Sequence, residues 1–416
     1  MKKVYFDVGA NNGNQFLNLS ANDPNVEVFA FEPTPELQII IESKVKNLPN
    51  YKLIKAAVSD YNGVSEFNVA GQSDWGCSSL LKFSKKSETD WPGRSDFKVT
   101  EKINVNVIRL DSFIEENNIT SIDYLHIDTQ GSDLNVLKGL GDKLKIVNGG
   151  VMEAATKKDI LYDNQNTVEE CIQFLESNNF LIEKLESNDQ FNNEVNIHFR
   201  KKKIAVFFSG RINNKEPHKS LTNIKDIQKK YDPIFFISLN NEVDDITFTN
   251  LVVENLNIQE DQFKSTNTNT PDIMFTFYKD PSAIVKNSYS QFKHNNECMK
   301  MIELYQKKHN MKFDIVIKYR MDINNFNDNI IEIENPITNT CYIPEGQDWG
   351  GINDQIAYGD FESMYKYCNV VNNIVNLCQS GVKFHPETLL LHHLEKEKLN
   401  IKRFKFNYTL LDRMKV

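Results

Sequence analysis

Two carboxylates in the first half of the chain directly follow strand-like runs. Asp128 comes after the apolar run at residues 122–127, and Glu153 comes shortly after a second run at residues 147–151. Open α/β sheets bind ligands at the carboxyl ends of their strands, so both side chains lie where a reaction is expected. A carboxylate there can orient a hydroxyl group, accept its proton or bind a divalent ion. We therefore predict that Asp128 and Glu153 are catalytic. His126 is an alternative base, unless it is satisfied within the sheet.

A glycine-containing turn at the start of the chain predicts a binding site for a nucleotide-like ligand. The apolar run at residues 4–6 leads into a turn at residues 7–13, and a helix-like segment starts at Gln15. Glycine lets the backbone turn sharply and approach a ligand, and the helix start offers unpaired N–H groups. About twenty residues further on, Glu32 ends the run at residues 26–31, at a spacing where an acid accepts hydrogen bonds from two ribose hydroxyls. The predicted binding residues are Asp7, Gly9, Asn11, Gly13 and Glu32.

Further runs supply the elements that position these residues. Residues 34–48 carry one apolar stripe behind Thr34 as a cap, which predicts a helix. Residues 51–58 predict a third strand, followed by a turn that contains Asp60. Asp60 is either a neighbour of the cofactor or an aspartate that stabilises its own turn. The polar residues 71–100 predict a lid over the site.

Several of these segments, in their order along the chain, resemble the FkbM-type methyltransferases. The segments are the glycine-containing turn, Glu32-Pro33, Ala56-Ala57-Val58-Ser59-Asp60, Leu110-Asp111-Ser112-Phe113 and Ile122-Asp123-Tyr124-Leu125-His126-Ile127-Asp128-Thr129-Gln130-Gly131. The resemblance covers approximately the first 200 of the 416 residues. It implies a Rossmann-like class I methyltransferase fold and an S-adenosylmethionine-dependent O-methyltransferase that acts on a sugar hydroxyl.

The chain departs from the family pattern at Gln130. Family members usually have Val-Glu-Gly where this chain has Thr129-Gln130-Gly131, so a neutral amide replaces one carboxylate. The resemblance therefore implies no base or metal ligand at this position, and Gln130 is predicted to hydrogen-bond the acceptor or the cofactor. Asp133 either keeps a negative charge nearby or favours the amino end of the following helix.

The second half repeats the alternation of strands and helices, which predicts a second α/β domain. Its strand-like runs lie at residues 204–208, 234–239 and 251–253, and a further run ends in Arg320-Met321-Asp322. The predicted domains are residues 1–202 and residues 203–416.

This half resembles the GT-A-type glycosyltransferases in the layout of its polar motifs. They are Arg320-Met321-Asp322, residues 348–359, His385-Pro386-Glu387 and His392-His393. The resemblance implies that Arg320 and Asp322 hold the diphosphate of a nucleotide sugar and that Asp354 faces the acceptor. It also implies Mg²⁺ or Mn²⁺ at Asp322 and His393. Because Arg320 replaces the first acid of the usual Asp-x-Asp, we expect weak dependence on the metal.

Together the halves predict a bifunctional glycan-modifying enzyme, in which an O-methyltransferase is joined to a glycosyltransferase. Its partners would be a carbohydrate acceptor and a nucleotide sugar. In the alternative, the second half only binds the acceptor or mediates dimerisation. Ionisable groups at Asp322, Asp354 and the histidines favour the enzyme, because a binding module does not need them.

Composition disfavours several other classes of protein. The 416 residues carry a formal net charge of −9, which disfavours a protein that grips a phosphate backbone, so no nucleic-acid partner is predicted. No signal pattern opens the chain, and no apolar run approaches the length of a membrane span. The six cysteines form no Cys-x-x-Cys pair and no zinc-finger spacing, which predicts reduced thiols and a cytoplasmic protein.

Overall fold

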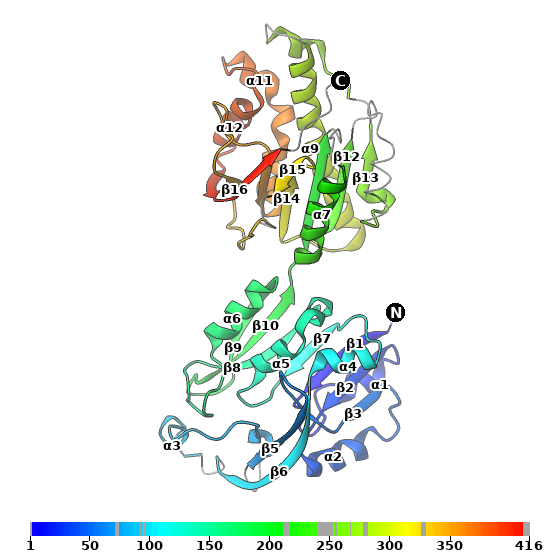
Figure 1. Cartoon of the computed structure of the whole chain (residues 1–416), viewed down its shortest axis with the longest axis vertical. Helices are drawn as coiled ribbons and strands as arrows, with labels where there is room; N and C mark the ends of the chain where they lie inside the picture. Colours follow the sequence, from blue (N-terminus) through cyan, green and yellow to red (C-terminus); the bar gives the residue numbers. More distant parts are fainter. Residues whose placement is uncertain are drawn as a thin grey trace. The chain divides into compact units, whose positions relative to one another are not determined.

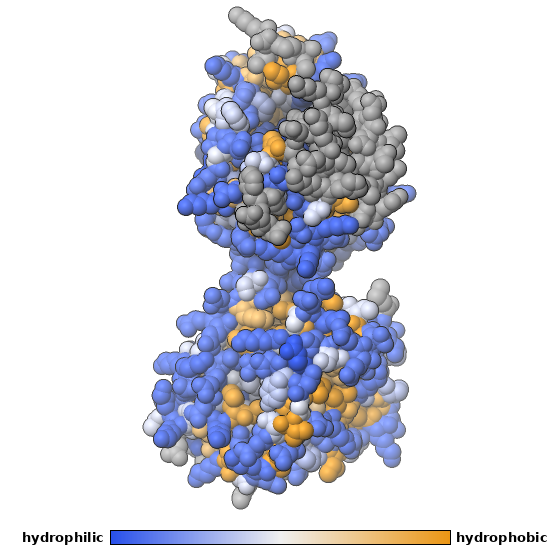
Figure 2. Space-filling view, in the orientation of Figure 1, coloured by the Kyte–Doolittle hydropathy of each residue, from blue (hydrophilic) through white to orange (hydrophobic). Residues whose placement is uncertain are grey.

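A computed structural model describes most of the chain. The described residues are 2–70, 75–91, 93–94, 97–210, 217–239, 253, 256–266, 268–277, 282–325 and 330–410. The chain forms two compact units, Met1–Lys201 and Lys202–Val416, and each has its own main sheet (Figure 1). Hydrophilic residues predominate on the visible face of both units (Figure 2). In the described ranges, no helix is both long and apolar enough to cross a membrane.

The first unit is built on a seven-stranded sheet with the strand order β3-β2-β1-β7-β8-β10-β9 (Figure 1). In this order, the five strands β3, β2, β1, β7 and β8 run parallel. β10 is antiparallel to both of its neighbours, β8 and β9. The seven strands are β1 (Lys3–Val8), β2 (Val26–Phe31), β3 (Tyr51–Ile54), β7 (Tyr124–Ile127), β8 (Gly149–Ala155), β9 (Phe180–Ser187) and β10 (Glu194–Lys201). The expected Rossmann-like α/β fold is confirmed for this unit.

Helices cover both faces of this sheet, because parallel strands need crossover connections. The helices are α1 (Leu17–Asn22), α2 (Pro35–Val45), α3 (Ser87–Asp90), α4 (Leu110–Glu116), α5 (Asp133–Gly139) and α6 (Val168–Ser177). On one face, the ring of Phe113 in α4 lies 5.1 Å from that of Phe31 and 5.5 Å from that of Phe29. On the other face, Phe16 and Ile41 pack against β2. Burial on both sides explains why these strands read as continuous apolar runs.

Two expected elements differ in detail from the structure. The helix predicted at residues 34–48 is α2, which ends at Val45. The strand predicted at residues 51–58 divides, because β3 pairs with β2 whereas β4 (Ala57–Val58) pairs with β6 (Val99–Ile108). The strands β4, β6 and β5 (Gly63–Ala70) form a separate three-stranded sheet. The run is therefore not one strand.

The second unit is built on another seven-stranded sheet, with the order β13-β12-β11-β14-β17-β16-β18. The strands β13, β12, β11 and β14 run parallel, and β17 is antiparallel to both of its neighbours. The strands are β11 (Ile204–Gly210), β12 (Ile234–Leu239), β13 (Phe263–Ser265), β14 (Ile315–Tyr319), β16 (Thr340–Pro344), β17 (Ile356–Gly359) and β18 (Asn400–Phe404). The run predicted at residues 234–239 is β12, and the run predicted at residues 251–253 lies almost wholly outside the described residues.

Helices also lie on both faces of the second sheet. α7 (Pro217–Tyr231) packs on the face that carries Val206 and Phe208, and α9 (Ser282–His309) packs on the face that carries Phe207 and Phe236. The other helices are α10 (Phe361–Cys368), α11 (Ile374–Gln379) and α12 (Pro386–Lys396), and a small pair of strands is formed by β15 (Ile323–Asn325) and β19 (Tyr408–Leu410). The expected α/β class is thus confirmed for this unit.

Candidate functional site

Backbone hydrogen bonds tie together the carboxyl ends of β1, β2 and β7. The N–H groups of Gly9 and Ala10 both donate to the carbonyl of Phe31 at 3.0 Å, and the N–H of Asp128 donates to the carbonyl of Val8 at 2.9 Å. Gly9 has a φ of +83°, and a Cβ atom there would lie 1.8 Å from the carbonyl oxygen of Asp128. Only glycine fits this position. The turn after β1 is therefore held against the strand end that carries Asp128.

A cavity opens at these strand ends, with about 530 Å³ of empty space when its open mouth is included. Asn11 and Glu32 contribute to its wall from the turn after β1 and the end of β2, and Asp128 and Gln130 contribute from the loop after β7. Apolar side chains complete it, among them Leu37, Val58, Phe67 and Leu80. Because Leu80 belongs to the segment predicted as a lid, the described part of that segment forms part of the wall. The cavity brings together five predicted site residues, namely Gly9, Asn11, Glu32, Asp128 and Gln130.

Glu32 is buried on the cavity wall, and the backbone holds its carboxylate. Oε2 accepts a hydrogen bond from the N–H of Asn11, and Oε1 accepts one from the N–H of Thr34, both at 2.8 Å. Burial raises the pKa of Glu32 to about 7, although these hydrogen bonds oppose the rise. A carboxylate oxygen can accept more than one hydrogen bond, so each oxygen retains capacity for a ligand hydroxyl. Glu32 therefore lies on the cavity wall, and its role in binding a ribose stays a prediction.

Three residues expected to bind the cofactor do not line the cavity. Asp7 is fully buried in β1, where its Oδ1 lies 2.9 Å from Nδ1 of His126. Gly13 packs against Ile41 of α2. Asp60 is exposed in its turn, away from the cavity wall. Nδ1 of His126 is engaged by Asp7 within the sheet, whereas Oδ2 of Asp7 is buried with no hydrogen-bond partner among the described residues.

Gln130 connects the two candidate catalytic carboxylates. Its Nε2 donates to Oδ1 of Asp128 at 2.6 Å and to Oε2 of Glu153 at 3.3 Å. Its Oε1 accepts a hydrogen bond from the hydroxyl of Tyr162 at 2.8 Å. Because only the NH₂ half of an amide donates to a carboxylate, these partners fix which way the side chain points. The expectation that Gln130 binds the acceptor or cofactor is thus refined, since its amide is engaged by the protein itself.

Four carboxyl groups gather at this side of the cavity. Asp133, Glu153 and Glu194 are buried, and Asp128 is half-buried. Burial raises the pKa of Asp133 to about 7 and that of Glu194 to about 8, and the charge of Asp128 adds to both shifts. Burial, with the charges of Asp128 and Glu194, also raises the pKa of Glu153 well above its usual value. Of these four groups, Asp128 is the one that lines the cavity.

The structure corrects the position expected for Glu153. The sequence predicts it at the rim, but it does not line the cavity and lies buried in contact with Gln130. Its other oxygen, Oε1, accepts a hydrogen bond from the side-chain amide of Asn188. Because Glu153 does not line the cavity, it is poorly placed to contact an acceptor there, and its raised pKa disfavours the ionised form that a base requires. Asp128 is therefore the better candidate of the two.

In the second unit, the polar residues at the end of β14 are held by hydrogen bonds within the protein. Arg320 binds Asp322 in a two-pronged arrangement, Nε to Oδ1 at 2.9 Å and Nη2 to Oδ2 at 2.6 Å. Lys318 donates through Nζ to the backbone carbonyl of Asp354, and the side chain of Asp354 accepts from Gln291 at 2.5 Å. Burial lowers the pKa of Lys318 to about 8. The charged side chains of this strand end therefore partner protein groups already.

The metal site implied by the sequence is not assembled. His393 is fully buried, its Nε2 lies 2.8 Å from the carbonyl oxygen of Lys366, and its Nδ1 lies 3.1 Å from Nδ2 of Asn373. Both ring nitrogens are thus occupied, and Asp322 is held by Arg320. Within the part of the chain that the structure describes, no group of three or more His, Cys, Asp or Glu side chains could hold a metal ion. This corrects the expectation for Asp322 and His393.

Known proteins resemble this chain mainly in its first unit. Residues 7–182 match the methyltransferase FkbM domain. The 2-O-methyltransferase NoeI of Sinorhizobium fredii is 29% identical over 142 residues, which cover 33% of this chain and 56% of that protein. The chain therefore spans about half the length of this curated relative. Residues 246–415 match a domain of unknown function.

Two solved methyltransferase-related structures also align with part of the chain, at low scores. Precorrin-6y C5,15-methyltransferase of Geobacter metallireducens has 15% identity and a TM-score of 0.26, and the alignment covers 49% of this chain and 82% of that one. Fibrillarin of Aeropyrum pernix, bound to S-adenosylmethionine, has 10% identity and a TM-score of 0.29, with 48% and 66% covered. Scores this low carry no conclusion about function.

The comparisons bear differently on the two resemblances seen in the sequence. The FkbM match supports the first one. The second one gains no support, because residues 246–415 match a family whose function is unknown. For the second unit the α/β class is shown, whereas a GT-A glycosyltransferase is not.

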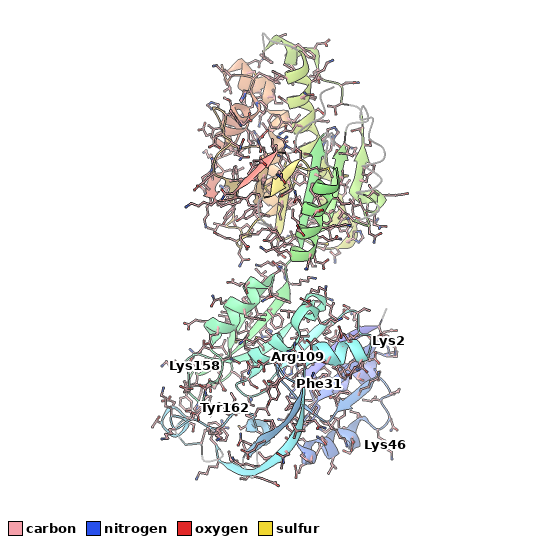
Figure 3. All side chains as sticks on the ribbon, viewed as in Figure 1. Lys2, Phe31, Lys46, Arg109, Lys158 and Tyr162 are labelled. Carbon is pink, nitrogen blue, oxygen red and sulfur yellow. The ribbon has the colours of Figure 1, made fainter. Side chains whose placement is uncertain are left out.

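Sequence reasoning missed two residues that hold Gln130 in place. Tyr162, which is labelled in Figure 3 and is buried, donates to the amide of Gln130, and the hydroxyl of Ser79 donates to its backbone carbonyl at 2.7 Å. Both lie in loops outside the strand-end motifs. The side chain of Gln165 accepts hydrogen bonds from backbone N–H groups of the loop that carries Tyr162, and so holds this loop. No local sequence pattern predicts this arrangement.

Proposed function

We propose that the FkbM-matched unit binds S-adenosylmethionine in its cavity and transfers the methyl group to a hydroxyl of a carbohydrate. The observation that carries the proposal is the cavity itself, whose wall holds a buried acid suited to a ribose, Glu32, and a candidate base, Asp128. The FkbM match and the relative named as an O-methyltransferase support the same reaction.

The residues along the cavity suit an adenosine with free hydroxyls. Each oxygen of Glu32 accepts one backbone N–H and retains capacity for a ribose hydroxyl. Val58 and Phe67 supply apolar surface for a flat ring. Gly9 contributes backbone to the wall, and its missing side chain lets the carbonyl of Asp128 approach closely. S-Adenosylmethionine would supply a methyl group on a positively charged sulfur.

Asp128 would orient the acceptor hydroxyl and receive its proton. As the acceptor oxygen bonds to the methyl carbon, the carbon–sulfur bond breaks and its electron pair remains on the sulfur, which becomes neutral. The hydroxyl proton passes to Asp128 and then to water. Holding the acceptor oxygen in line with the breaking bond contributes a large part of the rate, so the fixed position of Asp128 matters as much as its basicity.

The test uses the intact protein in two steps. Isothermal titration calorimetry with S-adenosylmethionine measures binding, and release of S-adenosylhomocysteine measures turnover on methyl glycosides of neutral hexoses, 6-deoxyhexoses and N-acetylhexosamines. We expect binding, and release with at least one glycoside. If the intact protein does not bind S-adenosylmethionine, the proposal is wrong.

We propose as a second activity that the other unit binds the diphosphate of a nucleotide sugar and transfers the sugar. The supporting observation is that β11 lies between β12 and β14. From β11 the chain continues to β12 and β13 on one side of the sheet, and it then crosses to β14 on the other side. Open α/β sheets bind ligands at such a switch point, at the carboxyl strand ends. Lys318 and Arg320 lie there, and Arg320 uses two of its five N–H donors for Asp322.

Titration of the intact protein with UDP and GDP, with and without Mn²⁺, tests the second activity. We expect binding without the metal, and its loss in Arg320→Gln. If neither nucleotide binds under either condition, the unit instead presents the acceptor or mediates dimerisation, and the second activity is abandoned.

A further inference from the structure

The loop after β7 holds Gln130 in one strained conformation. Gln130 has a φ of +56°, which is uncommon for a residue with a side chain and costs energy. The hydroxyl of Ser79 holds its carbonyl at 2.7 Å. Gly131 follows with a φ of +95°, and a Cβ atom there would lie 3.0 Å from both Tyr162 and Gln165. The packing of this loop therefore aims the amide of Gln130 in one direction.

The amide points between two acids of unequal exposure. Nε2 lies 2.6 Å from Asp128, which lines the cavity, and 3.3 Å from Glu153, which does not. A neutral donor in this place stabilises a carboxylate, whereas a third acid would repel it. The hydroxyl of Tyr162 lies 2.8 Å from Oε1 of Gln130 and also 2.8 Å from the carbonyl of Cys77. Because Tyr162 has a single hydroxyl proton, it can donate to only one of these two oxygens at a time, and the orientation of the amide follows from its own donation to the two acids.

We propose that Gln130 is a positioning residue, which holds the carboxylate of Asp128 in place on the cavity wall and separates it from buried Glu153. The inference rests on the proposed methyl transfer, because it requires Asp128 to receive the proton of the acceptor. Gln130 itself exchanges no proton. It acts through Asp128, and Tyr162 acts in turn through Gln130.

The charge at Asp128 is felt by titratable groups on several surrounding elements. They are His126 on β7, Asp133 on α5, Glu153 on β8, Glu194 on β10 and Tyr162 in the loop after β8. Four of these five, all except His126, become negatively charged when they lose a proton. Adding another acid at position 130 therefore makes ionisation of the group that takes the proton more costly.

The test compares Gln130→Glu and Gln130→Ala with the wild type in the intact protein. The pH dependence of kcat/KM is measured by release of S-adenosylhomocysteine, on the glycoside that the wild type methylates. We expect the acidic limb of Gln130→Glu to move up by about one pH unit. We expect Gln130→Ala to lower kcat about ten- to a hundredfold, with the Kd for S-adenosylmethionine changed less than about threefold. Gln173→Glu, the same change on the exposed face of α6, should leave the profile unmoved.

Two further variants separate positioning from a merely structural role. In Asp128→Asn the added change Gln130→Ala should cost little, because the group that it positions is already gone. Tyr162→Phe removes one hydroxyl and keeps the ring, so it should lower kcat severalfold, and it carries the test if Gln130→Glu does not fold. Additive losses, or an acidic limb that does not move, overturn the inference and leave methyl transfer standing. A wild type that methylates no glycoside overturns both.

Discussion

The strand ends of the two sheets carry opposite electrostatic arrangements. In the first unit, half-buried Asp128 and buried Glu153 flank the neutral amide of Gln130 beside a cavity, and Asp133 and Glu194 are two further buried acids. In the second unit, Arg320 forms a two-pronged pair with Asp322, and Lys318 donates to the carbonyl of Asp354. The first arrangement holds acidic groups close together, whereas the second one balances its charges internally.

The difference between the two units shows when a polar motif at the end of a strand indicates a functional site. Both halves of the sequence place acids there, and both resemble ligand sites on that basis. Groups whose pKa is shifted by burial and like charge are costly to keep, and they are concentrated at functional sites. A cation and an acid that bind each other need no ligand to account for their presence at a strand end. The first unit is therefore the stronger candidate for an active site.

Replacing Asp128 tests the active half of the comparison and should have the largest effect. Asp128→Asn removes the group that receives the proton, so we expect kcat to fall about a hundredfold or more while the Kd for S-adenosylmethionine stays nearly unchanged. Release of S-adenosylhomocysteine and calorimetry measure the two quantities. Asp142→Asn, on an exposed residue of the same unit, is the control. Full turnover by Asp128→Asn would show that the acids beside the cavity are not its base.

Breaking the balanced pair tests the other half of the comparison. Arg320→Ala leaves the carboxylate of Asp322 nearly buried without its main partner, so we expect the free energy of unfolding of the second unit to fall by about 3 kcal/mol. Urea denaturation followed by hydrogen exchange at the amides of β14 reports it. Arg320→Met combined with Asp322→Leu should recover most of the loss. An unchanged stability would mean that the pair is not structural.

Replacing Glu32 tests the predicted ribose site on the cavity wall of the first unit. Glu32→Ala deletes both carboxylate oxygens, and we expect S-adenosylmethionine to bind about ten- to a hundredfold more weakly, which is about 1–3 kcal/mol. Calorimetry measures the change. Glu36→Ala, an exposed acid in the first turn of α2, should bind normally. Equal affinity in both variants would remove Glu32 from the binding site.

The stability of the first unit should also depend on pH. Burial raises the folded pKa of Asp133 to about 7 and of Glu194 to about 8, so between pH 5 and pH 7 the folded state keeps protons that the unfolded state has lost. The stability that these groups contribute is present at low pH and is lost as the pH rises through the folded values. At about 1.4 kcal/mol for each pKa unit, we expect each of these two groups to contribute a loss of up to about 2 kcal/mol over this range.

Hydrogen exchange at the amides of β1 and β7, measured at several pH values, reports that loss. Asp133→Asn should flatten the slope, because the amide cannot titrate, whereas Asp142→Asn should not. A first unit whose stability rises from pH 5 to pH 7 would contradict the picture of buried, protonated acids.

The sequence by itself determined the class of the fold and the edge of the sheet where the site lies. Apolar runs separated by turns predict parallel strands, and parallel strands end at one edge, so Gly9, Glu32 and Asp128 had to come near each other. The sequence predicted Gly9 as a place where the backbone turns sharply and approaches a ligand, and the structure shows that its close neighbour is the backbone of Asp128. These features follow from local periodicity and backbone geometry, which a single sequence displays.

Only the tertiary structure decided which polar groups face the cavity and which are satisfied inside the protein. Three contacts that decide this join residues that are distant in the chain. They are the hydrogen bonds of Gln130 with Glu153, of Tyr162 with Gln130 and of Asp7 with His126. The partners of His393 likewise come from other elements. A strand-end motif shows that a side chain is available, but its charge and its access to a ligand depend on what packs against it, and that packing leaves no local pattern in the sequence.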